Sequence, residues 1–586
     1  MPSRAELSHN HSFKSPPAVT RHQRFSNEAL QKLRKLLLVR IAVDEVQQLR
    51  SMFSFRTLLT YVQHAAADYT DKPVFFIPKE LDDTPSEWEP VSYTRFSDDL
   101  ERAASYWTSF FGALGIARGA TVGLWLNGYA YSDIVHLFAL SGAGYVPQCL
   151  SKFTHVSIVK ALLDVNGTKY LIYGPPTAAV ALQLHELTPG LRLFEHPELS
   201  VIRKAPRQQD PFHPSGDDIV VIFHTSGSTG PHPKLVPYTH RFLDAALKKM
   251  NHVWTTFGGT RSTQMGSVMF TGSLSTLFGS VQNGGAIVLP HPDRVPYTSD
   301  DLIFLHGKGL MDSACILAPQ LRRYLTECET NRALLEVFVQ LRRIMFTGAT
   351  LFESDLADAR SHGINLMQAY ASSELSRVMY SSESDLVMRT IPGFNYSFVP
   401  VDGGSSTDAV KDRMFELVVP AGAPDLPHPS LLNRDGSFHT GDLFREVQPG
   451  AWEFCGRTDD MIKMYYGNCC ETKSIEADVL ATCFDIVQTC FIAGSGRIAP
   501  VLFVELQVDG DDAWRWTSAC EIARRLEPSQ ALRYSYDSVN DAQSIVIVPQ
   551  GGLPRTPKGS IRRVAVEEQY RVVMNAIDAK VTVSRT

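Results

Sequence analysis

A run of hydroxyl-bearing and glycine residues directly after an apolar segment is the part of the sequence best suited to chemistry. Glycines let the backbone turn tightly and aim amide groups at an anion, hydroxyls donate to phosphate oxygens, and a lysine adds positive charge. We therefore expect a phosphate-binding loop after the buried strand predicted over 218–223. Its candidate binding residues are Thr225, Ser226, Gly227, Ser228, Thr229, Gly230 and Lys234.

This loop does not fit the Walker A pattern of P-loop ATPases. That pattern requires a lysine, followed by serine or threonine, directly after its last glycine. Here Pro231 follows Gly230 and Leu235 follows Lys234, so a P-loop ATPase is disfavoured. The structural alternative is a Ser/Gly surface loop, and the apolar strand immediately ahead of the run argues against it.

Further motifs follow the loop in a fixed order. They occupy 346–350, 368–374, 439–442, 456–463 and 553–559. Together with the loop they resemble the motif series of the acyl-adenylate-forming superfamily, which includes acyl-CoA synthetases, nonribosomal peptide synthetase adenylation domains and firefly luciferase. The resemblance covers about residues 55–570 and rests on the joint order of the motifs, since each motif is weak or moderate by itself.

The resemblance implies a binding site for ATP. In it, the backbone at Gly348 and Ala349 lies along the adenine, and the ring of Tyr370 stacks on the base. Asp442 accepts both ribose hydroxyls, because an ionised carboxylate can take two donors. Arg457 contacts ribose or phosphate.

The resemblance also assigns residues to the phosphate end of the nucleotide. The hydroxyl of Ser373 meets phosphate and Glu374 holds Mg²⁺, since a hard cation prefers a carboxylate beside substrate phosphates. Taken alone, Glu374 would more often be a solvated acid than a metal ligand. The sequence departs from the family pattern at Thr347, Thr350 and Ala371.

Two residues further along the chain carry the predicted catalysis and motion. Lys558 is the main catalytic candidate, beside Glu374, because negative charge builds when a carboxylate attacks the α-phosphate, and a flexible ammonium can meet it. Asp459 matches the hinge about which a C-terminal lobe turns between half-reactions, which is a conformational gate. The phosphate loop is one residue longer than the family pattern between Gly230 and Lys234.

The resemblance implies two half-reactions. A carboxylic acid and Mg·ATP first give acyl-AMP and pyrophosphate, and a thiol then attacks the acyl-AMP. The thiol is either coenzyme A or the phosphopantetheine of a carrier protein acting in trans. Two alternatives stay open, namely a luciferase-like oxidising member of the family and a degenerate nucleotide-binding protein.

The acid itself is indicated by one short segment. Peptide-synthetase domains for α-amino acids place an aspartate in a Phe-Asp-x-Ser segment, where it pairs with the ammonium group. The matching positions here are Phe270 and Thr271, and Thr271 carries no charge. Because a buried ammonium needs a partner, we expect an acid without an α-amino group, such as an aryl, keto or fatty acid. The segments 122–126 and 144–147 are similar to fungal adenylation domains of secondary metabolism.

Composition and charge indicate which partners and which cellular location to expect. The 586 residues carry a formal net charge of −6, so nothing in the overall charge suggests a nucleic-acid partner. No apolar run approaches the roughly 20 residues of a membrane span. The nine cysteines are too few for a disulfide scaffold and predict a reduced, cytoplasmic protein. The Ser-rich, basic start is either a polar tail or a mitochondrial targeting segment.

The elements that must position these motifs alternate between helix-like and strand-like segments. The pattern predicts a helix over 98–114, a strand over 121–126 and a helix over 131–142, which is typical of an α/β fold with mainly parallel sheets. We predict a tail and amphipathic helix over 1–50, a large AMP-binding domain over 51–457 and a small, mobile α+β C-terminal domain over 458–586.

Overall fold

The computed structural model describes most of the chain from Phe55 to Arg585, which forms one of two compact units; the other, Met1–Ser54, lies outside the described residues. The predicted N-terminal tail and helix are therefore not described. Within the larger unit the structure leaves out 80–86, 153, 209–210, 226–233, 256–259, 265, 293–294, 349–350, 352, 382–385, 402–412, 459–460, 465–468, 531–538, 540 and 556–560.

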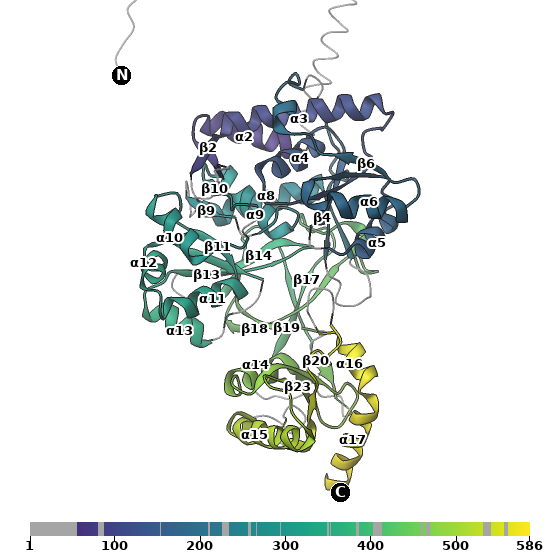
Figure 1. Ribbon diagram of the computed structural model, residues 1–586, viewed down its shortest axis with the longest axis vertical. Helices are drawn as coiled ribbons and strands as arrows, with labels where there is room; N and C mark the ends of the chain where they lie inside the picture. The colour runs from purple at the N-terminus through teal and green to yellow at the C-terminus, as the bar shows by residue number, and fades with distance from the viewer. Residues whose placement is uncertain are drawn as a thin grey trace, which may run out of the picture. The chain divides into compact units, whose positions relative to one another are not determined.

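A six-stranded sheet with the order β6-β5-β3-β4-β7-β8 holds the first predicted motif (Figure 1). Neighbouring strands run parallel except for the last pair, β7 and β8, which is antiparallel. The strands are β3 (Thr121–Leu126), β4 (Val146–Ser151), β5 (Tyr170–Tyr173), β6 (Arg192–Glu195), β7 (Ile219–Thr225) and β8 (Lys234–Thr239).

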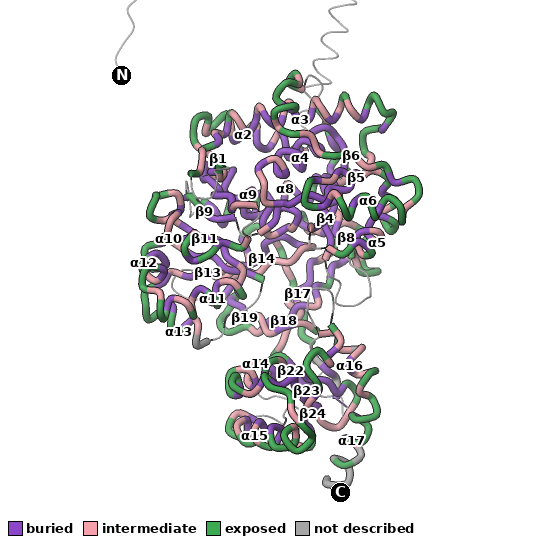
Figure 2. Tube along the Cα trace, viewed as in Figure 1, coloured by how far each residue is buried: buried purple, intermediate pink, exposed green. Residues whose placement is uncertain are grey.

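Helices cover both faces of this sheet because its strands are apolar on both sides. Val122, Leu124 and Leu126 pack into the main core with α3 and α4, whereas Trp125 points into a second core with α5 and α6. Helix α4 is buried along nearly its whole length (Figure 2). The helices are α3 (Tyr93–Ala113), α4 (Tyr131–Gly142), α5 (Val156–Asn166), α6 (Ala178–Leu187) and α7 (Leu199–Ile202), with a 3₁₀ turn η1 (Pro175–Thr177).

A four-stranded sheet and three helices complete the main core. The sheet order is β2-β1-β10-β9, from β1 (Pro73–Pro78), β2 (Trp88–Ser92), β9 (Arg261–Thr263) and β10 (Ala286–Val288). The helices are α2 (Leu58–Tyr69), α8 (His240–Trp254) and α9 (Thr271–Gln282). Both α8 and α9 contribute buried side chains to the main core, which places the predicted acid-binding segment at the start of a buried helix.

The nine-stranded sheet carries the later motifs and changes character along its length. Its order is β11-β12-β13-β14-β15-β19-β18-β17-β16; the first three strands are parallel and the rest antiparallel. The strands are β11 (Ala314–Leu317), β12 (Ile344–Thr347), β13 (Leu366–Ser372), β14 (Ser376–Ser381), β15 (Met388–Thr390), β16 (Ser397–Pro400), β17 (Met414–Val419), β18 (Phe438–Gln448) and β19 (Ala451–Arg457).

The parallel part of this sheet is sandwiched between two apolar clusters. One face packs against helices that gather around β11 and β13 (Figure 1), while Cys315, Met345 and Met367 point from the other face into the main core. The covering elements are α10 (Ser299–Gly307), α11 (Ala318–Cys328), α12 (Arg332–Gln340) and α13 (Glu353–Ser361), and a 3₁₀ turn η3 (Pro429–Leu431) follows β17.

The C-terminal part of the chain builds its own α+β core. A three-stranded sheet, β22-β23-β24, packs between two apolar clusters, and a short ribbon, β20-β21, precedes it. The elements are β20 (Met461–Lys463), β21 (Cys469–Glu471), α14 (Thr472–Thr482), β22 (Val487–Ala493), β23 (Val501–Leu506), α15 (Asp512–Gln530), η4 (Ala542–Ser544), β24 (Ile545–Val548), α16 (Arg563–Gln569) and α17 (Arg571–Arg585). The domain boundaries at residues 50 and 457 stay predictions.

The α/β fold class is confirmed, and the local predictions were accurate for the apolar elements. Strand β3 and helix α4 have the predicted bounds, and α3 begins five residues earlier than predicted. It begins there because the Ser92 side chain accepts a hydrogen bond from the Arg95 amide and caps the helix. In the described part of the chain, no helix is long and apolar enough to cross a membrane.

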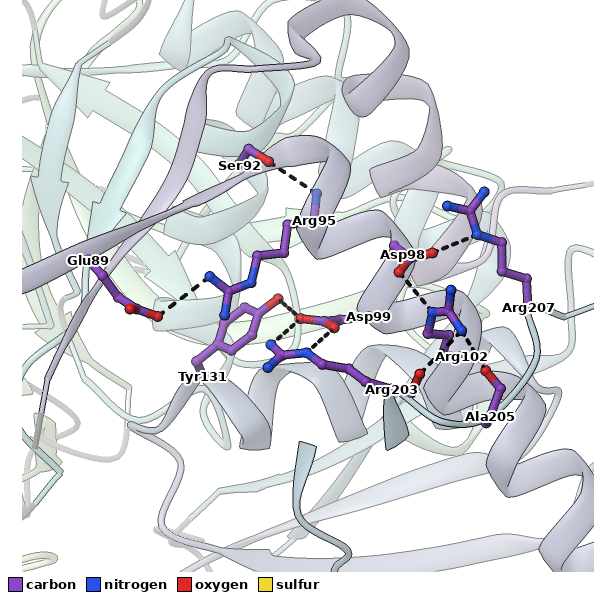
Figure 3. A network of polar contacts seen from close by, with 10 residues as sticks. All are labelled: Glu89, Ser92, Arg95, Asp98, Asp99, Arg102, Tyr131, Arg203, Ala205 and Arg207. Atoms are coloured by element: carbon purple, nitrogen blue, oxygen red, sulfur yellow. Dashed lines mark hydrogen bonds and ion pairs between the residues drawn. The ribbon is translucent and has the colours of Figure 1, made fainter. Parts of the chain in front are cut away.

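A network of paired charges fixes α3 to the segment after α7 (Figure 3). The Asp99 carboxylate accepts hydrogen bonds from Arg203 Nε and Nη2 at 2.8 and 2.9 Å, and from the Tyr131 hydroxyl at 3.0 Å. Nearer the solvent, Asp98 accepts from Arg102 at 2.8 Å and from Arg207 at 2.6 Å. This network is structural and lies apart from the predicted motifs.

Candidate active site

The predicted phosphate loop joins two paired neighbouring strands. Thr225 ends β7 and Lys234 begins β8, and the two residues face each other in the antiparallel register. Thr225 is half-buried and Lys234 is exposed. The loop residues Ser226, Gly227, Ser228, Thr229 and Gly230 lie outside the described residues, and their predicted contacts with phosphate stay predictions.

Three predicted nucleotide-binding residues come together although they lie far apart in the chain. The Tyr370 hydroxyl on β13 donates a short hydrogen bond to Asp442 Oδ2, and Arg457 Nη1 donates to Asp442 Oδ1 at 3.0 Å. Asp442 on β18 and Arg457 on β19 are direct cross-strand partners. The antiparallel pairing therefore creates this Tyr370–Asp442–Arg457 triad.

Local hydrogen bonds hold the Asp442 strand in place. The Thr440 hydroxyl accepts from the Asp442 amide at 3.0 Å and donates to the Leu417 carbonyl at 2.7 Å. The Gly441 amide donates to Glu416 Oε1 at 3.0 Å. Gly441 has a φ of 70°, in the left-handed region that favours glycine. The Thr-Gly-Asp motif thus has a structural reason at each of its positions.

The electrostatics of the triad keep its donor protonated. Burial, and next the negative charge of Asp442, raise the pKa of Tyr370 well above its ordinary value. Tyr370 is therefore a hydrogen-bond donor over the whole physiological pH range. Each carboxylate oxygen of Asp442 can accept more than one donor, so ribose hydroxyls can bind the same group.

Ser373 and Glu374 lie in the turn between β13 and β14, and core residues anchor this turn. The Tyr238 hydroxyl donates to the Ser373 carbonyl at 2.8 Å, and Lys249 Nζ donates to the Leu375 carbonyl at 2.6 Å. Burial raises the pKa of Tyr238, and the nearby charge of Glu374 raises it further. The half-buried Glu374 carboxylate is thus held close to the strand that follows the phosphate loop.

Sequence analysis missed the buried lysine behind this turn. Lys249 and Asp425 are both fully buried, 2.8 Å apart, and the Tyr396 hydroxyl donates to the same Asp425 oxygen at 2.5 Å. Burial lowers the pKa of Lys249, and the charge of Asp425 opposes that shift. The available signal was helical spacing, because Lys249 occupies the apolar stripe of α8 between Phe242 and Val253.

The predicted acid-binding residues begin helix α9. Phe270 is its N-cap and Thr271 is its first residue, buried against Tyr238, whose hydroxyl interacts with the Thr271 side chain. One turn later, Ser275 Oγ donates to the Thr271 carbonyl at 2.8 Å and lies 3.0 Å from Ser376 Oγ on β14. The structure therefore brings the acid segment next to the turn that carries Glu374.

Of the remaining predicted residues, the structure describes Gly348 and leaves the others out. Gly348 directly follows β12 with a φ of 90°, a conformation that L side chains rarely adopt, which explains a glycine at that point. Ala349, the hinge candidate Asp459 and the catalytic candidate Lys558 lie outside the described residues. The roles of all these residues stay predictions.

Comparison with protein families gives two matches that divide the chain. The family described as AMP-binding enzyme matches residues 62–397, and the family described as AMP-binding enzyme C-terminal domain matches residues 459–581. The first match contains the phosphate loop, the acid-binding segment and Glu374. The second begins at Asp459.

Curated relatives are fungal and bacterial. The chain is 27% identical over 518 residues to the AMP-binding domain-containing enzyme iboA of Amanita muscaria (strain Koide BX008), covering 85% of this chain and 98% of that protein. It is 24% identical over 391 residues to nonribosomal peptide synthetase 13 of Aspergillus fumigatus, covering 62% of this chain. The match spans only 17% of that synthetase's length.

Solved structures share the fold at low sequence identity. O-succinylbenzoate CoA synthetase (MenE) of Bacillus subtilis, in complex with its acyl-adenylate intermediate OSB-AMP, gives a TM-score of 0.68 at 15% identity, covering 86% of this chain and 97% of that one. ATP-bound MatB of Rhodopseudomonas palustris gives a TM-score of 0.67 at 16% identity, covering 87% and 99%. These likenesses establish the architecture in which the site residues lie.

Proposed function

This chain belongs to the AMP-binding enzyme family, and we propose that it uses ATP and Mg²⁺ to convert a carboxylic acid without an α-ammonium group into an acyl-AMP and pyrophosphate. The observation that carries the proposal is the Tyr370–Asp442–Arg457 triad, which joins three separately predicted nucleotide residues in one hydrogen-bonded group. Related structures with bound ATP and magnesium, such as that of MenE, support the choice of cofactor.

In the proposed site each residue has a defined task. Asp442 accepts the ribose hydroxyls while Arg457 and Tyr370 fix its orientation. Glu374 supplies a carboxylate to Mg²⁺, which typically binds one or two carboxylates together with substrate phosphates and water. The donor set fits that ion, because Glu374 lies in an anchored turn close to the strand after the phosphate loop. Mg²⁺ would neutralise charge on the phosphates.

The chemical step is a displacement at the α-phosphorus of ATP. A carboxylate oxygen of the acid forms a bond to that phosphorus, and the bond to the bridging oxygen of pyrophosphate breaks. The negative charge that develops on the phosphate oxygens needs donors placed in advance. Lys558, together with the hydroxyls and amides of the phosphate loop, is proposed to supply them.

The acid and the acceptor are the finer parts of the proposal. Thr271 begins a buried helix and offers a hydroxyl where an ammonium group would need a carboxylate, which supports an acid without an α-amino group. The acyl-AMP would then pass to a thiol, either coenzyme A or the phosphopantetheine of a carrier protein in trans. A cytoplasmic location is part of the same proposal.

ATP–pyrophosphate exchange with aryl, keto, fatty and amino acids tests the first half-reaction. We expect exchange with one class of non-amino acid, and a fall of about 10²–10³-fold in Lys558→Ala. Lys580→Ala, which removes an exposed lysine of α17, is the matched control and should leave the rate unchanged. Exchange with amino acids alone would contradict the assignment of Thr271. No exchange with any acid, in protein that binds ATP, would favour a degenerate nucleotide-binding protein.

A second variant tests the triad itself. Asp442→Ala removes the acceptor for the ribose hydroxyls, so we expect the KM for ATP to rise by about ten- to a hundredfold while the KM for the acid changes little. Unequal effects on the two substrates separate a nucleotide contact from a general loss of folding. An equal rise in both values would assign Asp442 a structural role only.

A further inference from the structure

A buried arginine close to the proposed site has no carboxylate partner among the residues that the structure describes. Arg377 on β14 follows Glu374 by three residues and is only 1% exposed. It forms no ion pair with any residue that the structure describes. Burying a guanidinium in this way is unfavourable unless some partner compensates the charge.

The groups that surround Arg377 are apolar or weakly polar. Arg377 Nη1 lies 2.9 Å from Met345 Sδ, and the guanidinium lies over the Trp254 ring, 4.9 Å from its centroid. Its Nε has no hydrogen-bond partner within the described chain. Burial lowers the pKa of Arg377 to about 10, so the side chain stays charged at neutral pH. The guanidinium of Arg377 is planar and charged, and its Nε–H makes no hydrogen bond within the described chain. Such a group is suited to binding a carboxylate.

Contacts of neighbouring residues place Arg377 near the proposed acid-binding helix. Its neighbour Ser376 lies with Oγ 3.0 Å from Ser275 Oγ of α9, one turn after Thr271. Cys315, paired with Met345 across the sheet, interacts with the charge of Arg377 and with the Thr276 hydroxyl of α9. The guanidinium is thus between α8, α9 and the parallel strands of the large sheet.

A cavity reaches one member of this group, Cys315, and neither Arg377 nor Ser376 is among its described lining residues. It has a volume of about 130 Å³, and its lining includes Cys315, Gln264 and Tyr129. That volume holds a small organic molecule and not merely one water. Gln264 contributes an acceptor to this lining. Its Nε2 donates to two backbone carbonyls, whereas its Oε1 has no hydrogen-bond partner among the described residues. Within the described chain, the guanidinium of Arg377 therefore has no ion-pair partner, and the amide oxygen of Gln264 in the neighbouring cavity has no donor.

We infer that Arg377 binds a second carboxylate of the substrate, so that the acid activated at the proposed site is a dicarboxylic acid. The inference rests on the proposed function, because it needs the reacting carboxylate to lie near Thr271 and Glu374. In this arrangement one carboxylate points toward the nucleotide and the other toward the core. The distal carboxylate supplies the ion pair that none of the described residues gives to Arg377.

Matched pairs of acids test the inference. ATP–pyrophosphate exchange is measured with aliphatic and aromatic diacids, each paired with the acid in which a methyl group replaces the distal carboxylate. We expect kcat/KM for the best diacid to exceed that of its partner by about 100-fold or more, because the methyl analogue leaves the buried guanidinium unpaired. Equal rates, or a preference for the methyl-ended acid, would overturn the inference.

Substitution of Arg377 assigns the preference to this side chain. In Arg377→Met, kcat/KM for the diacid should fall by about 100-fold while that for the methyl-ended acid stays within about twofold. Arg377→Lys keeps the charge but loses the fork, and an intermediate loss of about tenfold is expected. Arg203→Met is the control, since that arginine belongs to the network around Asp99, and it should leave the diacid preference unchanged. Parallel losses for both acids in Arg377→Met would show a structural role and overturn the inference.

The two proposals fail in different ways. Exchange with methyl-ended acids but not with diacids would contradict the inference about Arg377 and still support the adenylation proposal. No exchange with any acid would sink the adenylation proposal, and calorimetric binding of the diacids to wild type and Arg377→Met then decides the inference. Binding that requires Arg377 would support it, and absence of binding or binding equal in both proteins would overturn it.

Discussion

Two buried charges in this molecule, the carboxylate of Asp99 and the guanidinium of Arg377, have opposite surroundings. Arg203 donates two hydrogen bonds to Asp99, and Tyr131 adds a third to the same carboxylate (Figure 3). Arg377 is buried as well, and the described groups beside it are the Met345 thioether, the Trp254 ring and the Cys315 thiol. Described residues pair the first charge, whereas the second gains an ion pair only from the ligand that we propose.

The contrast separates stability from function. A satisfied network such as that of Asp99 holds α3 to the chain after α7, and removing Asp99 leaves the buried Tyr131 hydroxyl without its acceptor. An unsatisfied charge lowers stability in the absence of its ligand, as is common at functional sites. The two sites should therefore respond to substitution with opposite signs.

The largest expected effect is the loss of Asp99. Asp99→Ala leaves the buried Tyr131 hydroxyl without its acceptor and Arg203 without its partner, so the free energy of unfolding should fall by about 3 kcal/mol. Urea denaturation measures this change. The exchange activity of the folded fraction should be unaffected, since the network lies apart from the site. A loss of less than about 1 kcal/mol would remove the contrast between the two regions.

The buried carboxylate of Asp133 extends the comparison to a second negative charge. Asp133 accepts from the amides of Gly128 and Ala130, and its pKa is raised to about 6, mainly by burial. Because the folded state favours the protonated form, stability should fall as the pH rises from about 4 through 6. Asp133→Asn keeps the acceptor and should remove about 2 kcal/mol of that fall. Unfolding curves at pH 4 and pH 7 measure the difference, and identical pH profiles would contradict it.

Arg377 should show the reverse sign in stability. Arg377→Met replaces an unpaired buried charge with an apolar chain of similar length, and we expect the unfolding free energy to rise by about 1–2 kcal/mol without substrate. Thermal unfolding with and without a diacid is the measurement, and the diacid should stabilise only the wild type. A destabilised Arg377→Met would mean that packing on Trp254 outweighs the buried charge.

The smallest effect is expected at the outer edge of the α3 network. Asp98 pairs with Arg102 and Arg207, but all three side chains reach solvent, where ion pairs contribute little. Asp98→Ala should lower the unfolding free energy by about 0.5 kcal/mol, and added salt should shrink that difference. If Asp98→Ala lowered the unfolding free energy as much as Asp99→Ala, solvent exposure would not determine how much these ion pairs contribute to stability.

Sequence reasoning was strongest where a local pattern determines the structure. The apolar run of β3 and the buried helix α4 have the predicted bounds, because periodicity and burial agree there. Motif order also predicted that Tyr370, Asp442 and Arg457 share a site. Long-range side-chain pairs could not be predicted, because no pattern in the sequence indicates that Lys249 pairs with Asp425, 176 residues away. The antiparallel half of the large sheet and the isolation of Arg377 were missed for the same reason.

The pairing of β7 with β8 has a consequence for how the phosphate loop can change over evolution. Thr225 and Lys234 are cross-strand partners, so the ladder fixes both ends of the loop whatever its length. An added residue between Gly230 and Lys234 changes the path of the connection but not the place where Lys234 begins its strand. Loop length can therefore vary among relatives while Lys234 stays at the start of β8. A one-residue deletion in the loop should be tolerated more readily than a one-residue shift inside either strand.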